Sequence, residues 1–146
     1  MSKSLQELLS LKGKTAVVTG GAGYLGTAIC ETLAELGANL VLASRDEEKC
    51  QKKSEELTRQ NGDAIRAVGL ELNVLNKESV KEFVDKVHEH FDSIDILVNN
   101  AWSGNKNTWE SISDEDWEYD INMSLNSVFR LKKPSFPISR LLVASS

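Results

Sequence analysis

Apolar and polar positions divide the chain into two alternating kinds of segment. Short apolar runs rich in β-branched residues, typical of buried strands, occupy residues 14–19, 39–43, 64–72 and 94–98. Longer amphipathic segments predict helices over residues 25–36, 46–61, 77–91 and 113–131. Because strands alternate with helices, the pattern predicts an α/β fold, a doubly wound parallel sheet with helices on both faces.

The pattern changes after residue 131. Pro134 and Pro137 interrupt the helical spacing, since proline lacks an N–H and clashes with the preceding turn. Residues 139–144 are apolar again and are a candidate fifth strand. We therefore expect a single domain over residues 13–146, with about five strands in an incomplete sheet, preceded by a lead segment of residues 1–12.

Composition narrows the possible partners. The 146 residues carry a net charge of −5, so no overall field attracts nucleic acid or an anionic membrane. Cys30 and Cys50 form neither a CxxC pair nor a metal-ligand spacing, as expected for two buried thiols in a reducing compartment. Residues 1–11 contain no apolar stretch long enough for a signal peptide. These features predict a cytoplasmic protein with no nucleic-acid, membrane or metal partner.

A glycine-rich turn follows the first predicted strand and opens the first helix. Residues 21–26 match G-x-G-x-x-G, and this strand–turn–helix context is what makes the pattern informative. Glycine lets the backbone come within hydrogen-bonding distance of phosphate oxygens, and the positive helix N-terminus stabilises the anion. The turn therefore predicts a site for the pyrophosphate of a dinucleotide. Its candidate binding residues are Thr19, Gly20, Gly21, Gly23, Tyr24, Leu25 and Gly26.

The end of the second predicted strand bears on the choice of dinucleotide. A carboxylate there would bind the ribose 2′-hydroxyl of NAD, whereas an arginine favours the 2′-phosphate of NADP. Ser44 stands where the carboxylate is expected and Arg45 follows it, which favours NADP over NAD. Two alternatives stay open: Arg45 is a solvated surface charge, or Asp46 is the ribose ligand rather than the cap of the next helix.

The glycine turn together with Asn99-Asn100-Ala101 resembles the short-chain dehydrogenase/reductase family over about residues 10–131. The resemblance implies a Rossmann-type fold and hydride transfer between a nicotinamide cofactor and an alcohol or carbonyl substrate, in a homo-oligomer. It implies that Asn73 and Val74 contact adenine. It further implies that Asn99, Asn100 and Ala101 stabilise the sheet and line the nicotinamide ribose, and that Asn122 positions an active-site water.

The chain departs from the family pattern at several positions. Tyr24 stands where classical members have the middle glycine of the turn, Asn73 replaces an aspartate, and Trp102 replaces the glycine of Asn-Asn-Ala-Gly. The spacing of the turn also resembles the extended epimerases and dehydratases. The Asn99-Asn100-Ala101 motif favours the classical members, because extended members usually lack it.

The Tyr-x-x-x-Lys pair with which the family reduces carbonyls is absent from this sequence. Tyr24 is followed four residues later by Ala28, and Tyr119 by Met123. Ser146, at the end of the candidate fifth strand, resembles the catalytic serine. We therefore expect a C-terminally truncated member. Two hypotheses follow: an NADP-dependent oxidoreductase by family, or a chain that holds a nucleotide without turning over substrate.

Overall fold

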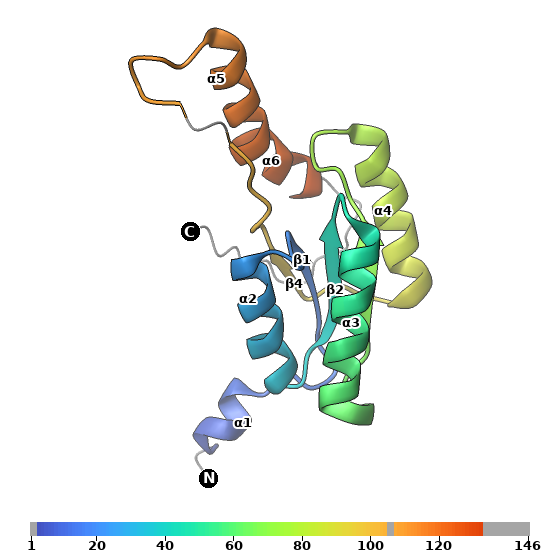
Figure 1. Ribbon diagram of the computed structural model, residues 1–146. Helices are drawn as coiled ribbons and strands as arrows, with labels where there is room; N and C mark the ends of the chain where they lie inside the picture. The colour runs from blue at the N-terminus through green and yellow to red at the C-terminus, as the bar shows by residue number, and fades with distance from the viewer. Residues whose placement is uncertain (1–2, 105–106, 133–146) are drawn as a thin grey trace.

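The computed structural model describes residues 3–104 and 107–132 (Figure 1). Four parallel strands form one sheet in the order β3-β2-β1-β4, with bounds β1 (Thr15–Thr19), β2 (Asn39–Ser44), β3 (Ala67–Glu71) and β4 (Ile96–Val98). The helices are α1 (Leu5–Leu9), α2 (Tyr24–Glu35), α3 (Glu47–Asn61), α4 (Lys77–His90), α5 (Asp114–Ile121) and α6 (Ser127–Lys132). No helix among the described residues is long and apolar enough to cross a membrane.

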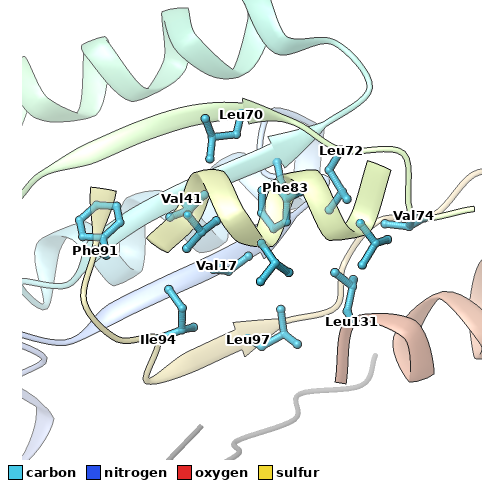
Figure 2. Packing of buried hydrophobic residues seen from close by; sticks show 14 of the residues in the cluster. Val17, Val41, Leu70, Leu72, Val74, Phe83, Phe91, Ile94, Leu97 and Leu131 are labelled. Carbon is cyan, nitrogen blue, oxygen red and sulfur yellow. The ribbon is translucent and has the colours of Figure 1, made fainter. Parts of the chain in front are cut away.

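Helices cover both faces of the sheet, as the alternating pattern predicts. Successive residues of a strand point to opposite faces, so β1 and β2 supply two separate cores. One core lies between the sheet and helices α2 and α3 and contains Ala16, Val18, Leu40, Leu42, Cys30, Ala34, Cys50 and Leu57. The other lies under α4 and α6 and includes Val17, Val41, Phe83, Leu97 and Leu131 (Figure 2).

Most predicted elements are confirmed, with shifted ends. The third strand begins at Ala67 rather than at residue 64, because Gly62–Ala64 form a 3₁₀ turn. Just before this strand, the side chain of Asn39 binds the chain at Arg66, because its Oδ1 accepts the backbone N–H of Arg66 over 2.8 Å. The lead segment contains a short helix, α1, which Ser4 and Glu7 cap reciprocally. The candidate fifth strand lies outside the described residues.

Two helices differ from their predicted form. In α2 the buried positions are Gly26, Cys30 and Ala34, with Ile29 and Leu33 partly buried beside them, whereas Leu25 is 63% exposed. The helix predicted over 113–131 begins as expected, with Ser113 accepting the N–H of Asp116 over 3.1 Å. It is interrupted by a π turn at Asn122–Asn126, which separates α5 from α6. Helix α5 extends away from the sheet (Figure 1).

Candidate dinucleotide site

Three hollows lie side by side along the carboxyl edge of the sheet, where ligands of open parallel sheets bind. A groove of about 570 Å³ runs over the glycine turn and is lined also by Arg45, Lys49 and Asn100. A second hollow lies by Asn73 and Val74. A third is lined by Asn99 and the residues around Ser127. The fold therefore brings together at one edge most of the residues that the sequence predicts for the cofactor.

The glycine turn is shaped by close backbone contacts. Gly20 has a positive φ of 67°, and a Cβ there would lie 3.0 Å from Asn100 Nδ2. A Cβ on Gly26 would overlap the carbonyl of Gly20, so only glycine permits this approach of helix to turn. Gly23 is the N-cap of α2, and no side chain caps the first turn of that helix. Its N–H groups at Tyr24, Leu25 and Gly26 stay available for an anion at the positive end of the helix dipole.

Thr19 joins the turn to the end of β4. Its Oγ1 accepts the backbone N–H groups of Asn100 and Ala101, each over 3.0 Å, and donates to the carbonyl of Val98. The Asn100 amide in turn donates to the carbonyls of Thr19 and Gly20 at 3.1 and 3.3 Å. Thr19 is 1% exposed, so these bonds are shielded from water. Asn100 therefore acts as a brace between neighbouring strand ends.

Arg45 is exposed at the end of β2 and lines both the groove and the hollow beside Asn73. Its guanidinium has no hydrogen-bond partner among the described residues, which leaves its donors available to an anionic ligand. The carboxylate of Asp46 instead caps α3, accepting the N–H of Lys49 over 3.0 Å. Ser44 Oγ is engaged with Asp46 and with Cys50 Sγ at 3.1 Å. Within residues 44–50, Arg45 and Lys49 are therefore the two cations that line the groove.

Asn73 and Val74 form one wall of the second hollow. Asn73 Oδ1 accepts the N–H of Leu75 over 3.1 Å, and its own N–H donates to Ser79 Oγ over 3.0 Å. These bonds fix the turn after β3 and leave the Asn73 Nδ2 donor without a partner among the described side chains. Val74 is 6% exposed and contributes apolar surface. The wall thus offers one hydrogen-bond donor beside a flat apolar surface.

The third hollow contains an unsatisfied polar atom. Asn99 Oδ1 is buried and accepts no hydrogen bond from the described residues. A buried acceptor without a partner is costly, and such an atom at a site edge is typical of one completed by a ligand or water. Asn99, Asn100 and Ala101 all line this hollow, and their contact with the nicotinamide ribose stays a prediction.

Asn122 lies apart from the hollows. Its Oδ1 accepts from Asn126 Nδ2 at 2.8 Å and from Arg130 Nη2 at 3.4 Å, and its carbonyl accepts the N–H of Ser127 in the π turn. Its side chain is thus used within the helix. The prediction that it positions a water stays untested, and Ser146 lies outside the described residues.

Sequence reasoning missed several lining residues. Lys49 faces the groove one helical turn after the cap at Asp46, a spacing that the sequence displays. Tyr119 and Met123 line the second hollow from α5 and the π turn, although no local motif marks them. Their place in the site depends on how this helix packs over the sheet, which periodicity does not specify.

Two thiols lie directly behind the glycine turn. Cys30 Sγ donates to the carbonyl of Gly21 over 3.7 Å, and Cys50 Sγ contacts Ser44 Oγ. Burial raises the pKa of both thiols, that of Cys30 to about 12. Both therefore stay protonated near neutral pH and pack as small apolar groups, as the sequence predicts.

Comparisons with known proteins bear on the family of this chain. The short chain dehydrogenase family matches residues 14–139. The chain is 38% identical over 125 residues to the 3-oxoacyl-[acyl-carrier-protein] reductase of Escherichia coli (strain K12), which covers 86% of the chain and 49% of the relative. The chain therefore spans about half the length of the curated relatives it matches.

Solved structures of similar fold carry dinucleotides. An alcohol dehydrogenase from the archaeon Thermococcus sibiricus, complexed with 5-hydroxy-NADP, superposes with a TM-score of 0.77 at 35% identity, covering 84% of this chain and 51% of that one. L-sorbose reductase from Gluconobacter frateurii, complexed with NADPH and L-sorbose, gives a TM-score of 0.77 at 32% identity, covering 84% and 46%. With its parallel sheet, its glycine turn and this match over residues 14–139, the chain belongs to the short-chain dehydrogenase family.

Proposed function

We propose that this chain binds NADP(H) along the carboxyl edge of its sheet and serves oxidoreductase chemistry on an alcohol or carbonyl substrate. The observation that carries the proposal is the groove that joins an uncapped helix N-terminus to two cations, Arg45 and Lys49. The NADP-type ligands of the Thermococcus and Gluconobacter proteins support the same assignment.

The residues present fit an extended dinucleotide. The N–H groups of Tyr24, Leu25 and Gly26 would hold the pyrophosphate in the groove that these residues line, and the absence of a Cβ at Gly26 lets the helix approach the turn closely. Arg45 would bind the 2′-phosphate, as a guanidinium readily does. Asn73 and Val74 would contact adenine.

The other half of the cofactor would lie by Asn99, Asn100 and Ala101. The unsatisfied Asn99 Oδ1 accepts a hydrogen bond from a ribose hydroxyl in this proposal. When bound, the nicotinamide supplies the hydride that such oxidoreductases exchange with a substrate carbon. The described residues position the cofactor through the braced backbone of Asn100 and Thr19.

Equilibrium dialysis of the chain against NADP and NAD tests the proposal. We expect measurable binding of NADP and weaker binding of NAD. Gly26→Ala forces a Cβ against the Gly20 carbonyl and should weaken NADP binding by about tenfold, since overpacking of a tight contact costs about 1–3 kcal/mol. Gly62→Ala is the control for a strained glycine replacement away from the groove: Gly62 has a positive φ, which Gly26 lacks, and nothing lies near its Cβ position. Absence of NADP binding by the unmodified chain would refute the proposal.

The surroundings of the two tyrosines favour a second function, in which the chain binds a nucleotide without turning over substrate. Neither Tyr24 nor Tyr119 is followed by the lysine of a Tyr-x-x-x-Lys pair, so this chain has no such pair to donate a proton to a carbonyl oxygen. We expect the 146-residue chain to bind NADPH but not to oxidise it with aldehydes or ketones. Steady oxidation of NADPH at enzymatic rates would contradict this second function and leave the first in place.

Homo-oligomerisation is also proposed. Leu125 and Phe129, on the π turn and α6, are 64% and 63% exposed, and large exposed apolar side chains are common at interfaces. Sedimentation velocity over a range of concentrations should show an assembly larger than a monomer. A monomer at every concentration would exclude it.

A further inference from the structure

Trp102 stands where the three hollows meet. It lines the hollow beside Asn73, the groove over the glycine turn and the hollow beside Asn99. Of the described residues, no other lines all three. A ligand that extends from the groove into both neighbouring hollows must therefore pass this side chain.

The backbone around Trp102 is held on both sides. Before it, Ala101 N–H donates to Thr19 Oγ1 over 3.0 Å. After it, a hydrogen bond of 2.7 Å joins Ser103 Oγ to the Oη of Tyr119, which lies on α5. The indole itself lies against Gly104, where a Cβ would come 2.6 Å from Trp102 Cζ2. These contacts fix the position from which the side chain projects.

The side chain nevertheless remains 73% exposed. Its Nε1–H, a donor only, has no acceptor among the described residues. A large apolar ring on a fixed backbone, with an unused donor at the edge of a site, is arranged to contact a ligand rather than to pack in a core.

We infer that Trp102 is a cofactor-contacting residue whose indole packs against the central ribose–pyrophosphate part of the dinucleotide. The inference rests on the proposed function, because the pyrophosphate is placed by the glycine turn in the groove that Trp102 borders. It adds a contact made by a side chain that stands where the family pattern has glycine. The bound cofactor covers the ring, and removing the ring weakens binding.

The affinity test compares Trp102→Ala with Trp117→Ala. Trp117 is half exposed on α5 and lines none of the three hollows, so it is a matched control. We expect Trp102→Ala to raise the dissociation constant for NADP about three- to tenfold, the range of one aromatic contact. Trp117→Ala should leave it unchanged. Equal thermal midpoints of the two variants check that both are folded.

Tryptophan fluorescence provides a second measurement that does not depend on an alanine variant being folded. Titration with NADP should quench part of the emission of the unmodified chain. That part should disappear in Trp102→Phe and persist in Trp109→Phe and Trp117→Phe, because only the indole of Trp102 contacts the ligand. Quenching that survives in Trp102→Phe would overturn the inference.

The outcomes separate the inference from the proposed function. If the unmodified chain binds no NADP, both are overturned. If it binds NADP and Trp102→Ala binds equally well, only the inference is overturned. Tighter binding by Trp102→Ala would mean that the indole obstructs the site, which also overturns the inference.

Discussion

Residues 15–98 and residues 99–132 both line the site, but they bury their apolar side chains to different degrees. In the first region Tyr24 and Leu25 are the exposed large apolar residues, and both lie at the start of α2. The second region is less than half as long and exposes Trp102, Trp109, Trp117, Leu125 and Phe129. The first region contributes the glycine turn and the cations Arg45 and Lys49 to the site, and the second contributes Trp102, Tyr119 and Met123.

The contrast shows which parts of the site are stable by themselves. The glycine turn is fixed by contacts within β1, α2 and the end of β4, such as those of Thr19 and Asn100. The interrupted helix of residues 114–132 is joined to the sheet by few buried residues, among them Met123 and Leu131. Most of its remaining apolar surface is open to water or to a partner.

The largest expected effect is on the free energy of unfolding, and it compares the loss of a leucine side chain in each of the two regions. Leu97, in β4, is 1% exposed, whereas Leu125, in the π turn, is 64% exposed. Leu97→Ala should lower the free energy of unfolding by about 2–5 kcal/mol, because it leaves a cavity in the core. Leu125→Ala should change it by less than about 0.5 kcal/mol. Urea denaturation measures both; equal losses would mean that residues 99–132 are as tightly packed as the sheet.

The next effect concerns the joint between the two regions. Thr19→Val keeps the shape of the side chain but leaves the N–H groups of Asn100 and Ala101 without their acceptor. We expect a loss of about 1–3 kcal/mol in the free energy of unfolding, the cost of an unsatisfied buried donor. Thr19→Ser should restore most of it. Thr32→Val is the control, because that hydroxyl is exposed on α2; a similar loss there would show that Thr19 is not special.

A smaller effect is expected on NADP affinity when the cation at the end of β2 is removed. Arg45→Ala should weaken NADP binding about tenfold, in line with the loss of one charge-assisted contact. NAD binding should change little, since NAD has no 2′-phosphate. Arg59→Ala, in the last turn of α3, is the charge-matched control. If Arg45→Ala and Arg59→Ala lower NADP affinity equally, the effect is one of net charge rather than of a specific site.

The smallest effect depends on pH. Desolvation raises the pKa of Asp95, but hydrogen bonds from Lys14 and Thr15 outweigh it, and the pKa lies below its ordinary value. A lowered carboxyl pKa stabilises the fold above the unfolded value of about 3.9 and this stability is lost as pH falls through the folded pKa. Asp95→Asn should cost less than about 1 kcal/mol at neutral pH, because Lys14 is half exposed.

Unfolding measured from neutral to strongly acidic pH checks the sign. The difference between the unmodified chain and Asp95→Asn should shrink below about pH 4, where the unmodified carboxylate becomes protonated. A difference that grows on acidification would exclude this ion pair as its source.

The predictable part of the fold is the part governed by local patterns. Buried strands, the end of α3 at Gly62 and the caps at Asp46 and Ser113 all follow from residue types at short spacing, and the structure confirms them. The start of α2 depends instead on a contact between residues that no periodicity displays. Close contact between Gly26 and the Gly20 carbonyl turns that helix so that Leu25 faces solvent.

The site, like the fold, could be predicted only where neighbouring residues in the sequence set its geometry. The turn and Arg45 are found from the sequence because their geometry comes from consecutive residues. Tyr119 and Met123 enter the site through the packing of helices over the strand ends, whereas Lys49 follows the cap at Asp46 by one helical turn, a spacing that the sequence displays. The Asn122 side chain bonds to Asn126 within the interrupted helix, and its expected role in positioning a water stays a prediction.

The sequence by itself determined the family, the parallel sheet and the position of the glycine-rich turn, because each depends on short-range patterns of apolar residues and glycine. Only the tertiary structure decided which side chains border the site. The buried hydrogen bonds between Thr19 and Asn100 bring together segments about eighty residues apart and place Trp102 at the junction of three hollows. Such long-range contacts arise from packing of the whole sheet, which no local pattern contains.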